Sequence, residues 1–293
     1  MMNRDRIAPA LDLALPPCLS GSAPDRVDYS FETIDYPGDG FTRLLGINNS
    51  GVIAGYHGAT TNKGFTYDVS TKAFTNESFP GSAETQVIGI NNLGRTSGFY
   101  VTTSGRTLGF TAKAGVYTLV SLHGTPFNRL LSQNDFAQAA GYYSATADGS
   151  GPDHAYIYDE GGGVFETFTL PDSVSARATG INNLGDVCGF SIDGSNKMHG
   201  WLQVWGRVTL LDFPGATATQ PLGLNNKRLV VGSYTDSSNN AHGFVYEVST
   251  RKWQSIDDPS GDGTVVNGIN DQGVLVGFYG TSPTNSGFVA TPR

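Results

Sequence analysis

The sequence of 293 residues has little cysteine, little charge and no long apolar run. Its two cysteines, Cys18 and Cys188, are too few for a disulfide-rich scaffold. Charged residues make up 15% of the chain, the formal net charge is −8, and no block of Lys or Arg offers nucleic acid a basic surface. No stretch of about 18 apolar residues is available to cross a bilayer. We therefore expect neither nucleic acid nor a membrane as a partner.

Sustained helical periodicity is also missing. Glycine is abundant, at 39 residues, and aromatic and β-branched residues are plentiful. This composition is typical of an all-β protein with many tight turns.

A phrase of the form Gly-Ile-Asn-Asn-x-Gly recurs along the chain, most clearly at residues 89–94. Its first Asn falls at positions 48, 91, 134, 182, 225 and 270, which gives spacings of 43, 43, 48, 43 and 45 residues. A period of this length is typical of a four-stranded propeller blade. The sequence therefore predicts six repeated blades.

Each period divides into four strand-like runs, which we name A to D; in the second repeat they are residues 86–91, 95–101, 108–112 and 116–122. A D-type run at 31–38 precedes the first A run, and the chain ends on a C-type run at 286–291. The first run therefore has no blade of its own, and the last blade has no D strand. Both problems are solved if the first run becomes the D strand of the last blade. We therefore predict that residues 29–293 form a single six-bladed β-propeller, closed by an N-terminal strand that completes the last blade.

Residues 1–28 precede the first repeat. Arg4 and Arg6 resemble the basic start of a signal peptide, but Asp12 and several prolines interrupt the apolar segment that follows. We expect a flexible leader and favour a cytoplasmic over a secreted protein. We also expect a monomer without a cofactor.

The phrase Gly-Ile-Asn-x-x-Gly, the Gly-Phe-Tyr that follows it, and the tripeptides His-Ala-Tyr at 154–156 and His-Gly-Phe at 242–244 resemble the HAF-repeat family, named for His-Ala-Phe. The resemblance covers about residues 29–293 and implies a bacterial propeller. It implies no particular chemistry, because the family has no single activity. Lys63, Leu108 and Ser286 replace the motif histidine in three repeats.

Strand A is predicted to begin beside the axis, on the face of the D–A and B–C loops. The residues that begin the six A strands therefore form a ring around the axis. Three of them are Arg, whose planar N–H donors suit carboxylate, phosphate or sulfate. The alternative is salt bridging to loop carboxylates such as Glu84 or Asp262. The six positions are Arg43, Gln86, Arg129, Arg177, Gln220 and Val265, and we assign ligand contacts to all of them except Val265.

The end of strand B is predicted to reach the same mouth. Tyr there suits ligand binding and proton donation. We assign acid–base candidates to His57, Tyr100 and Tyr143 and ligand contacts to Tyr234 and Tyr279; the alternative is that these rings only pack the blades. The six positions are His57, Tyr100, Tyr143, Ser191, Tyr234 and Tyr279.

Three histidines, His154, His199 and His242, begin strand C in consecutive blades. That strand lies two strands from the axis, so their side chains are too far apart to share a metal. We predict no metal site, and a repeated hydrogen bond from each His to a loop backbone. Aspartates of the B–C loops (148, 153, 193 and 236) are open to cation binding, acid–base work or simple turn roles.

The leading hypothesis is a binding propeller for a small anionic or sugar-like ligand at this mouth. The first alternative is an enzyme at the same mouth, a lyase, cyclase or hydrolase, with Arg stabilising negative charge and His57 or a Tyr moving the proton. The second is a structural or protein-interaction repeat. No nucleophile motif favours the enzyme.

Overall fold

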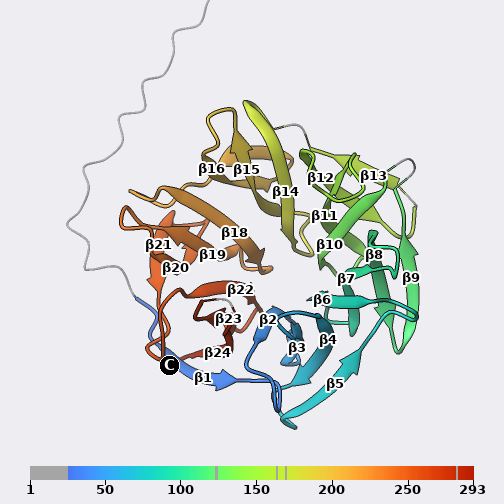
Figure 1. Cartoon of the computed structure of the whole chain (residues 1–293). Coiled ribbons are helices and arrows are strands. Elements are labelled where there is room, and N and C mark those ends of the chain that lie inside the picture. The colour runs from blue at the N-terminus through green and yellow to red at the C-terminus, as the bar shows by residue number, and fades with distance from the viewer. Residues whose placement is uncertain (1–25, 123–124, 163, 169, 282) are drawn as a thin grey trace, which may run out of the picture.

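The computed structural model describes residues 26–122, 125–162, 164–168, 170–281 and 283–293. They form six four-stranded antiparallel sheets in a ring around a central axis, which confirms the predicted six-bladed propeller (Figure 1). Most of the predicted leader, including Cys18, lies outside the described residues. No helix in the described segments is long and apolar enough to cross a membrane.

The strands of each blade follow one another from the axis outward, as predicted for A to D (Figure 1). The first three blades are β2 (Thr42–Ile47), β3 (Val52–His57), β4 (Lys63–Asp68) and β5 (Ala73–Glu77); β6 (Glu84–Ile90), β7 (Arg95–Val101), β8 (Thr107–Lys113) and β9 (Val116–Val120); β10 (Phe127–Gln133), β11 (Gln138–Ser144), β12 (Asp153–Asp159) and β13 (Val164–Thr167). The next two are β14 (Ser173–Ile181), β15 (Val187–Asp193), β16 (Met198–Val204) and β17 (Arg207–Leu210); β18 (Ala218–Leu224), β19 (Leu229–Thr235), β20 (Ala241–Glu247) and β21 (Lys252–Ile256).

The sixth blade joins the two ends of the described chain. It contains β22 (Val265–Ile269), β23 (Leu275–Tyr279), β24 (Ser286–Pro292) and β1 (Tyr29–Ile34). Strand β1 pairs antiparallel with β24 from Tyr29↔Pro292 to Ile34↔Gly287. This is the predicted closure: the first described strand supplies the outer strand that the last blade lacks.

Each blade packs a strand-B glycine against a strand-C aromatic ring. In blade 4, Gly189 lies opposite Trp201, and a Cβ on Gly189 would be 2.6 Å from the indole. Trp201 is fully buried. The same cross-strand pair recurs as Gly55↔Phe65, Gly98↔Phe110, Gly141↔Tyr156, Gly232↔Phe244 and Gly277↔Phe288. The repeated glycine before the aromatic pair is therefore a packing requirement of the blade.

The inner strands carry a register shift at one equivalent point in all six blades, for example between Val87 and Gly89. Five of the six residues after the shift are the repeat glycine, and there the strand approaches the inner strand of the adjacent blade. A Cβ on Gly268 would be 2.4 Å from the carbonyl oxygen of Leu45 in blade 1. The bulge and the glycine together bring the inner strands close around the axis.

Candidate functional site

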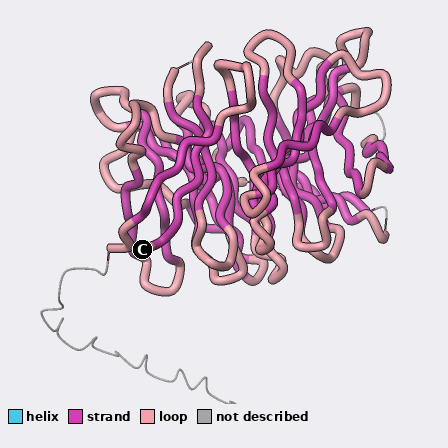
Figure 2. The backbone as a smooth tube through the Cα atoms, turned by 90° about the horizontal axis from the view of Figure 1, so that it is seen from below, coloured by secondary structure: helices cyan, strands magenta, loops and turns pink. Residues whose placement is uncertain are grey.

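The six blades meet in a central channel whose two ends differ. The A–B and C–D turns gather at one end and the D–A and B–C loops at the other; Figure 2 shows the strands running between these two faces. We name the first the turn end and the second the loop end.

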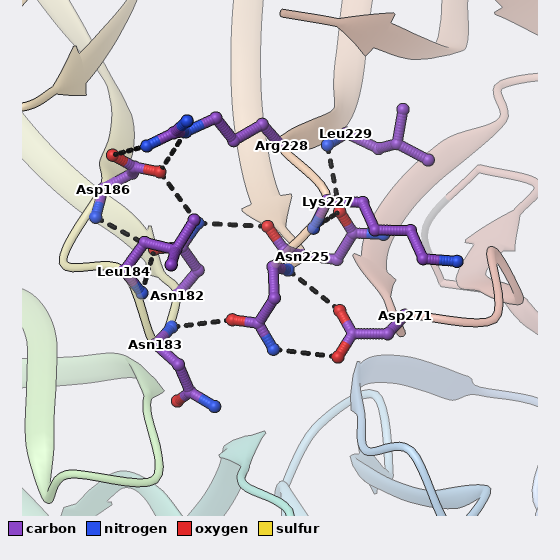
Figure 3. A network of polar contacts seen from close by, with 10 residues as sticks. Asn182, Asn183, Leu184, Asp186, Asn225, Lys227, Arg228, Leu229 and Asp271 are labelled. Atoms are coloured by element: carbon purple, nitrogen blue, oxygen red, sulfur yellow. Dashed lines mark hydrogen bonds and ion pairs between the residues drawn. The ribbon is translucent and has the colours of Figure 1, made fainter.

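At the turn end, the first Asn of each repeat forms a closed circle of hydrogen bonds. Asn48 Nδ2 donates to the carbonyl oxygen of Asn91 at 3.1 Å, and the series continues until Asn270 Nδ2 donates to the carbonyl oxygen of Asn48. The intermediate donors are Asn91, Asn134, Asn182 and Asn225. Each of these side chains also accepts two backbone N–H groups of its own turn, such as Leu184 and Asp186 in blade 4 (Figure 3).

The second residue of each repeat forms an outer circle. Its backbone N–H donates to the side-chain Oδ1 of the next blade, all the way round; the members are Asn49, Asn92, Asp135, Asn183, Asn226 and Asp271. Both carboxylates accept amides from the two blades beside them. Asp271 Oδ2 accepts from Asn226 and Asn49, each at 2.8 Å, and part of this network is drawn in Figure 3.

These circles line a cavity of about 100 Å³ on the axis. Gln133 also lines it, is 4% exposed, and has no hydrogen-bond partner for its amide atoms within the described chain. A space of this size and polarity suits a few ordered water molecules and is smaller than the ~300 Å³ of a small-molecule pocket. The turn end is therefore closed and structural.

At the loop end, the predicted Arg ring is paired across the sheet with aromatic rings. Arg43 lies opposite Tyr56, Arg129 opposite Tyr142, and Arg177 opposite Phe190. Directly paired residues share one face of a sheet, so each guanidinium stands beside an aromatic ring of its own blade. The three other pairs are Gln86↔Phe99, Gln220↔Ser233 and Val265↔Phe278.

Each guanidinium also stacks on an aromatic ring of the preceding blade. The Arg43 guanidinium carbon lies 4.3 Å from the centre of the Phe278 ring, and that of Arg129 lies 4.2 Å from Phe99. The Arg177 carbon lies 4.5 Å from Tyr142. Stacking orients a guanidinium while leaving N–H donors at its edge.

Only one of the three Arg side chains is neutralised by a carboxylate. Arg177 Nε donates to Asp153 Oδ2 at 2.6 Å. Arg43 donates to neutral oxygens, Oδ1 of Asn285 and the Tyr56 hydroxyl. Within the part of the chain that the structure describes, neither Arg43 nor Arg129 is in an ion pair. The expected alternative, internal salt bridging, thus applies to one Arg of three, and its partner is Asp153.

Tyr142 links two of the guanidiniums. Its ring is 3% exposed and lies within 6 Å of both Arg129 and Arg177, at 5.9 and 4.5 Å. Burial raises the pKa of Tyr142 above its ordinary value, although both guanidiniums and a hydrogen bond from Arg129 act in the opposite direction. The phenol is therefore neutral at physiological pH and does not neutralise Arg129, which has no carboxylate partner in the described chain.

The polar members of the ring in blades 2 and 5 are engaged locally. Gln86 Nε2 donates to Asn62 Oδ1 at 2.5 Å. Gln220 Nε2 contacts Met198 Sδ at 2.8 Å, and its Oε1 accepts from Ser233 at 3.4 Å. The positive charge of the ring therefore comes from blades 1, 3 and 4.

The predicted strand-B candidates do not join this ring, which corrects the expectation that both sets line one mouth. His57 lies opposite Thr42, and Tyr100 opposite Thr85, one residue away from the Arg pairs. An offset of one residue puts a side chain on the other face of a strand. His57, Tyr100 and Tyr234 instead stack on rings from the D–A corners, with centroids 3.6–3.7 Å apart: Tyr36, Phe79 and Phe213.

The other two candidates also pack within blades. Tyr143 stacks on His154 at 5.0 Å, and the Tyr279 hydroxyl shares a hydrogen bond with the Thr33 hydroxyl at 3.1 Å. His57 Nδ1 is 2.8 Å from Asp39 Oδ2, and its side chain is 9% exposed. A catalytic role for His57, Tyr100 or Tyr143 stays a prediction, now without an Arg beside it.

Two of the three strand-C histidines, His199 and His242, bond to carboxylates and not to the predicted loop backbone. His242 Nδ1 lies 2.8 Å from Asp257, and its Nε2 lies 3.4 Å from Asp236. His199 repeats this arrangement with Asp212 and Asp193, whereas His154 stacks on Tyr143. His199 and His242 therefore each tie a B–C loop to the end of strand D.

Three of the four loop aspartates, Asp148, Asp193 and Asp236, have turn roles, whereas Asp153 pairs with Arg177. The backbone N–H of Lys197, the Ser195 hydroxyl and further donors outweigh a partial burial and lower the pKa of Asp193 to about 2. Asp148 and Asp236 accept N–H groups from their own loops in the same way. Nowhere in the described ranges do three or more His, Cys, Asp or Glu side chains form a cluster that could hold a metal ion.

No family model matches this chain, and no curated protein does either. Among solved structures it is similar to TolB from Acinetobacter baumannii, with a TM-score of 0.57 and 14% identity over 76% of this chain. It spans 56% of that TolB chain.

Two further similar structures come from complexes. One is Aleuria aurantia lectin in complex with Fucalpha1-6GlcNAc, with a TM-score of 0.51 and 9% identity over 87% of this chain and 97% of the lectin. The other belongs to a nidogen/laminin complex, with a TM-score of 0.51 and 12% identity over 78% of this chain and 84% of that chain. At such identities the likeness shows the fold alone.

Proposed function

We propose that the protein binds a small anionic ligand, such as a sugar acid, at the loop end of the channel. The observation that carries this proposal is that Arg43 and Arg129 are held against aromatic rings with no carboxylate partner in the described chain. Half-buried cations without a partner are unfavourable in themselves. A bound carboxylate or phosphate would offset that cost.

The guanidiniums are oriented before any ligand binds. They stack on Phe99, Tyr142 and Phe278, the first two of which are buried. An orientation fixed before binding reduces the entropy lost on binding. The lectin named above, which is described with a fucose-containing sugar, is a propeller that binds sugars; it supports the class of ligand and not its identity.

Titration calorimetry with glucuronate, and with glucose as the neutral counterpart, tests the proposal. We expect tighter binding of glucuronate, and a loss of about 10-fold or more in Arg129→Gln, because a hydrogen bond to a charged group contributes roughly 1.5–3 kcal/mol. Arg106→Gln is the matched control, since Arg106 is an exposed cation of a B–C loop on the same face. Equal affinities for both sugars, or an unchanged Arg129→Gln, would contradict the proposal.

A further inference from the structure

A second groove lies between blades 4 and 5, on the turn face of the molecule. It encloses about 800 Å³ and extends from strand β17 to the A–B turn of blade 5. Its apolar walls include Val204, Leu210 and Tyr246. This is the size range of a small-molecule or oligosaccharide site.

An exposed tryptophan stands at the groove. Trp205, in the C–D turn of blade 4, is 84% exposed. The guanidinium carbon of Arg228 lies 4.5 Å from the centre of its ring. Arg228 is itself held by Asp186, which is almost fully buried, with Nε 2.7 Å from Oδ2 (Figure 3). The chain of contacts orients the indole while most of its surface stays open.

The groove is positively charged, although the whole chain has a formal net charge of −8. Four cations line it, Arg207, Lys227, Arg228 and Arg251, and no Asp or Glu does. Arg228 is compensated by Asp186, but none of the other three is in an ion pair among the described residues. Its charge therefore suits a ligand with several anionic groups.

One of the lining residues departs from the repeat at a backbone cost. Arg228 has a φ of 59° at the turn position where four of the six repeats place glycine. A left-handed conformation costs a non-glycine residue about 1–2 kcal/mol. Trp205 has a φ of 51°, as Ala114 has a φ of 50° in the C–D turn of blade 2, and it lines the same groove as Arg228.

We infer that this groove binds an acidic oligosaccharide, with one sugar ring stacked on Trp205 and its carboxylates or sulfates held by Arg207, Lys227 and Arg251. A pyranose has a flat C–H face that matches an indole and carries its anionic group rigidly. An acidic peptide is less suited. A peptide would extend the outer strand edge of a blade, and every blade has such an edge, whereas Trp205 and its cations occur in this groove. The site is independent of the one proposed at the loop end.

Calorimetry with tetragalacturonate tests the inference, with maltotetraose as the neutral probe and hexaglutamate as the acidic peptide. We expect tetragalacturonate to bind more tightly than either and to quench Trp fluorescence. Trp205→Gly should weaken it by about 10-fold or more; glycine accepts the left-handed backbone, so the variant retains its fold. The double variant Lys227→Gln, Arg251→Gln should reduce affinity several-fold and flatten its salt dependence.

Matched controls are Phe136→Ala, an exposed ring on the A–B turn of blade 3, and Lys113→Gln, an exposed cation of blade 2. Both should bind tetragalacturonate as the wild type does. Arg129→Gln should leave the quenching of Trp fluorescence by tetragalacturonate unchanged, which separates the groove from the loop end. The inference is overturned if maltotetraose or hexaglutamate binds as tightly as tetragalacturonate, or if Trp205→Gly binds like the wild type.

Discussion

The two ends of the channel are built from the same six strands and behave oppositely. At the turn end, the first two residues after Gly-Ile satisfy one another in closed circles, and the remaining cavity is about 100 Å³. At the loop end, the six equivalent positions hold three Arg, two Gln and one Val, and two of the Arg have no carboxylate partner in the described chain. The positions that repeat in every blade therefore stabilise the fold, and the positions that differ between blades include side chains that are free to bind a ligand.

The same contrast applies within a single turn. Four repeats place glycine at the fourth position of the A–B turn, whereas blade 5 places Arg228 there, next to the exposed Trp205. The regular turns complete the circles. The irregular turn completes its circle too and, in addition, presents a side chain to a groove.

The strongest disruption of the regular part is expected from Gly268→Ala. The new Cβ would be 2.4 Å from the Leu45 carbonyl oxygen of the next blade, so the inner strands must separate. Overpacking of this kind costs about 3 kcal/mol of unfolding free energy. Urea denaturation measures the loss, with Gly40→Ala as the control because nothing lies within 4 Å of its added Cβ. Equal losses in the two variants would contradict the account of the close approach.

A smaller loss is expected from Asn182→Ala, which opens the inner circle. The Asn182 side chain accepts the N–H groups of Leu184 and Asp186 and donates to the carbonyl oxygen of Asn225. Its removal leaves buried groups without partners, at a cost of about 2 kcal/mol.

The comparison for this variant is Gln220→Ala at the loop end. Gln220 contacts only a thioether and one hydroxyl, so we expect a change below about 1 kcal/mol in the same urea titration. A Gln220→Ala loss as large as that of Asn182→Ala would show that the two ends do not differ in this way.

Much of the fold was readable from the sequence because its signals are periodic. The spacing of the Asn residues predicted six blades, and the unmatched runs at 31–38 and 286–291 predicted the pairing of β1 with β24. The positions of the Arg ring were also predicted. These residues lie three positions before the repeat glycine, where strand A begins, and strand order alone puts the start of strand A beside the axis. These inferences depend only on strand order.

The composition of the site was less predictable because it depends on register. A bulge lies in every inner strand, and a shift of one residue decides whether Tyr142 or Tyr143 stands beside Arg129. No local pattern distinguishes these two neighbouring tyrosines. Trp205 and Arg228 were missed although Arg228 visibly replaces glycine in the repeat; their contact joins two blades, and sequence spacing does not show it.

A loss smaller than that of Asn182→Ala, and one that depends on pH, is expected from Asp271→Asn. Burial alone would raise the pKa of Asp271, but the amides of Asn49 and Asn226 and the charge of Lys227 bring it below the ordinary 3.8. A lowered folded-state pKa adds stability that is present above pH 4 and is lost as pH falls through that pKa. In Asp271→Asn, the new amide faces the amides of Asn49 and Asn226. The substitution should therefore lower the free energy of unfolding by about 1 kcal/mol at pH 7 and by progressively less below pH 4. Asp262→Asn, at an exposed carboxylate, is the control and should show no such difference. If the cost of Asp271→Asn were the same at pH 7 and pH 3, the carboxylate would not be what holds the outer circle together.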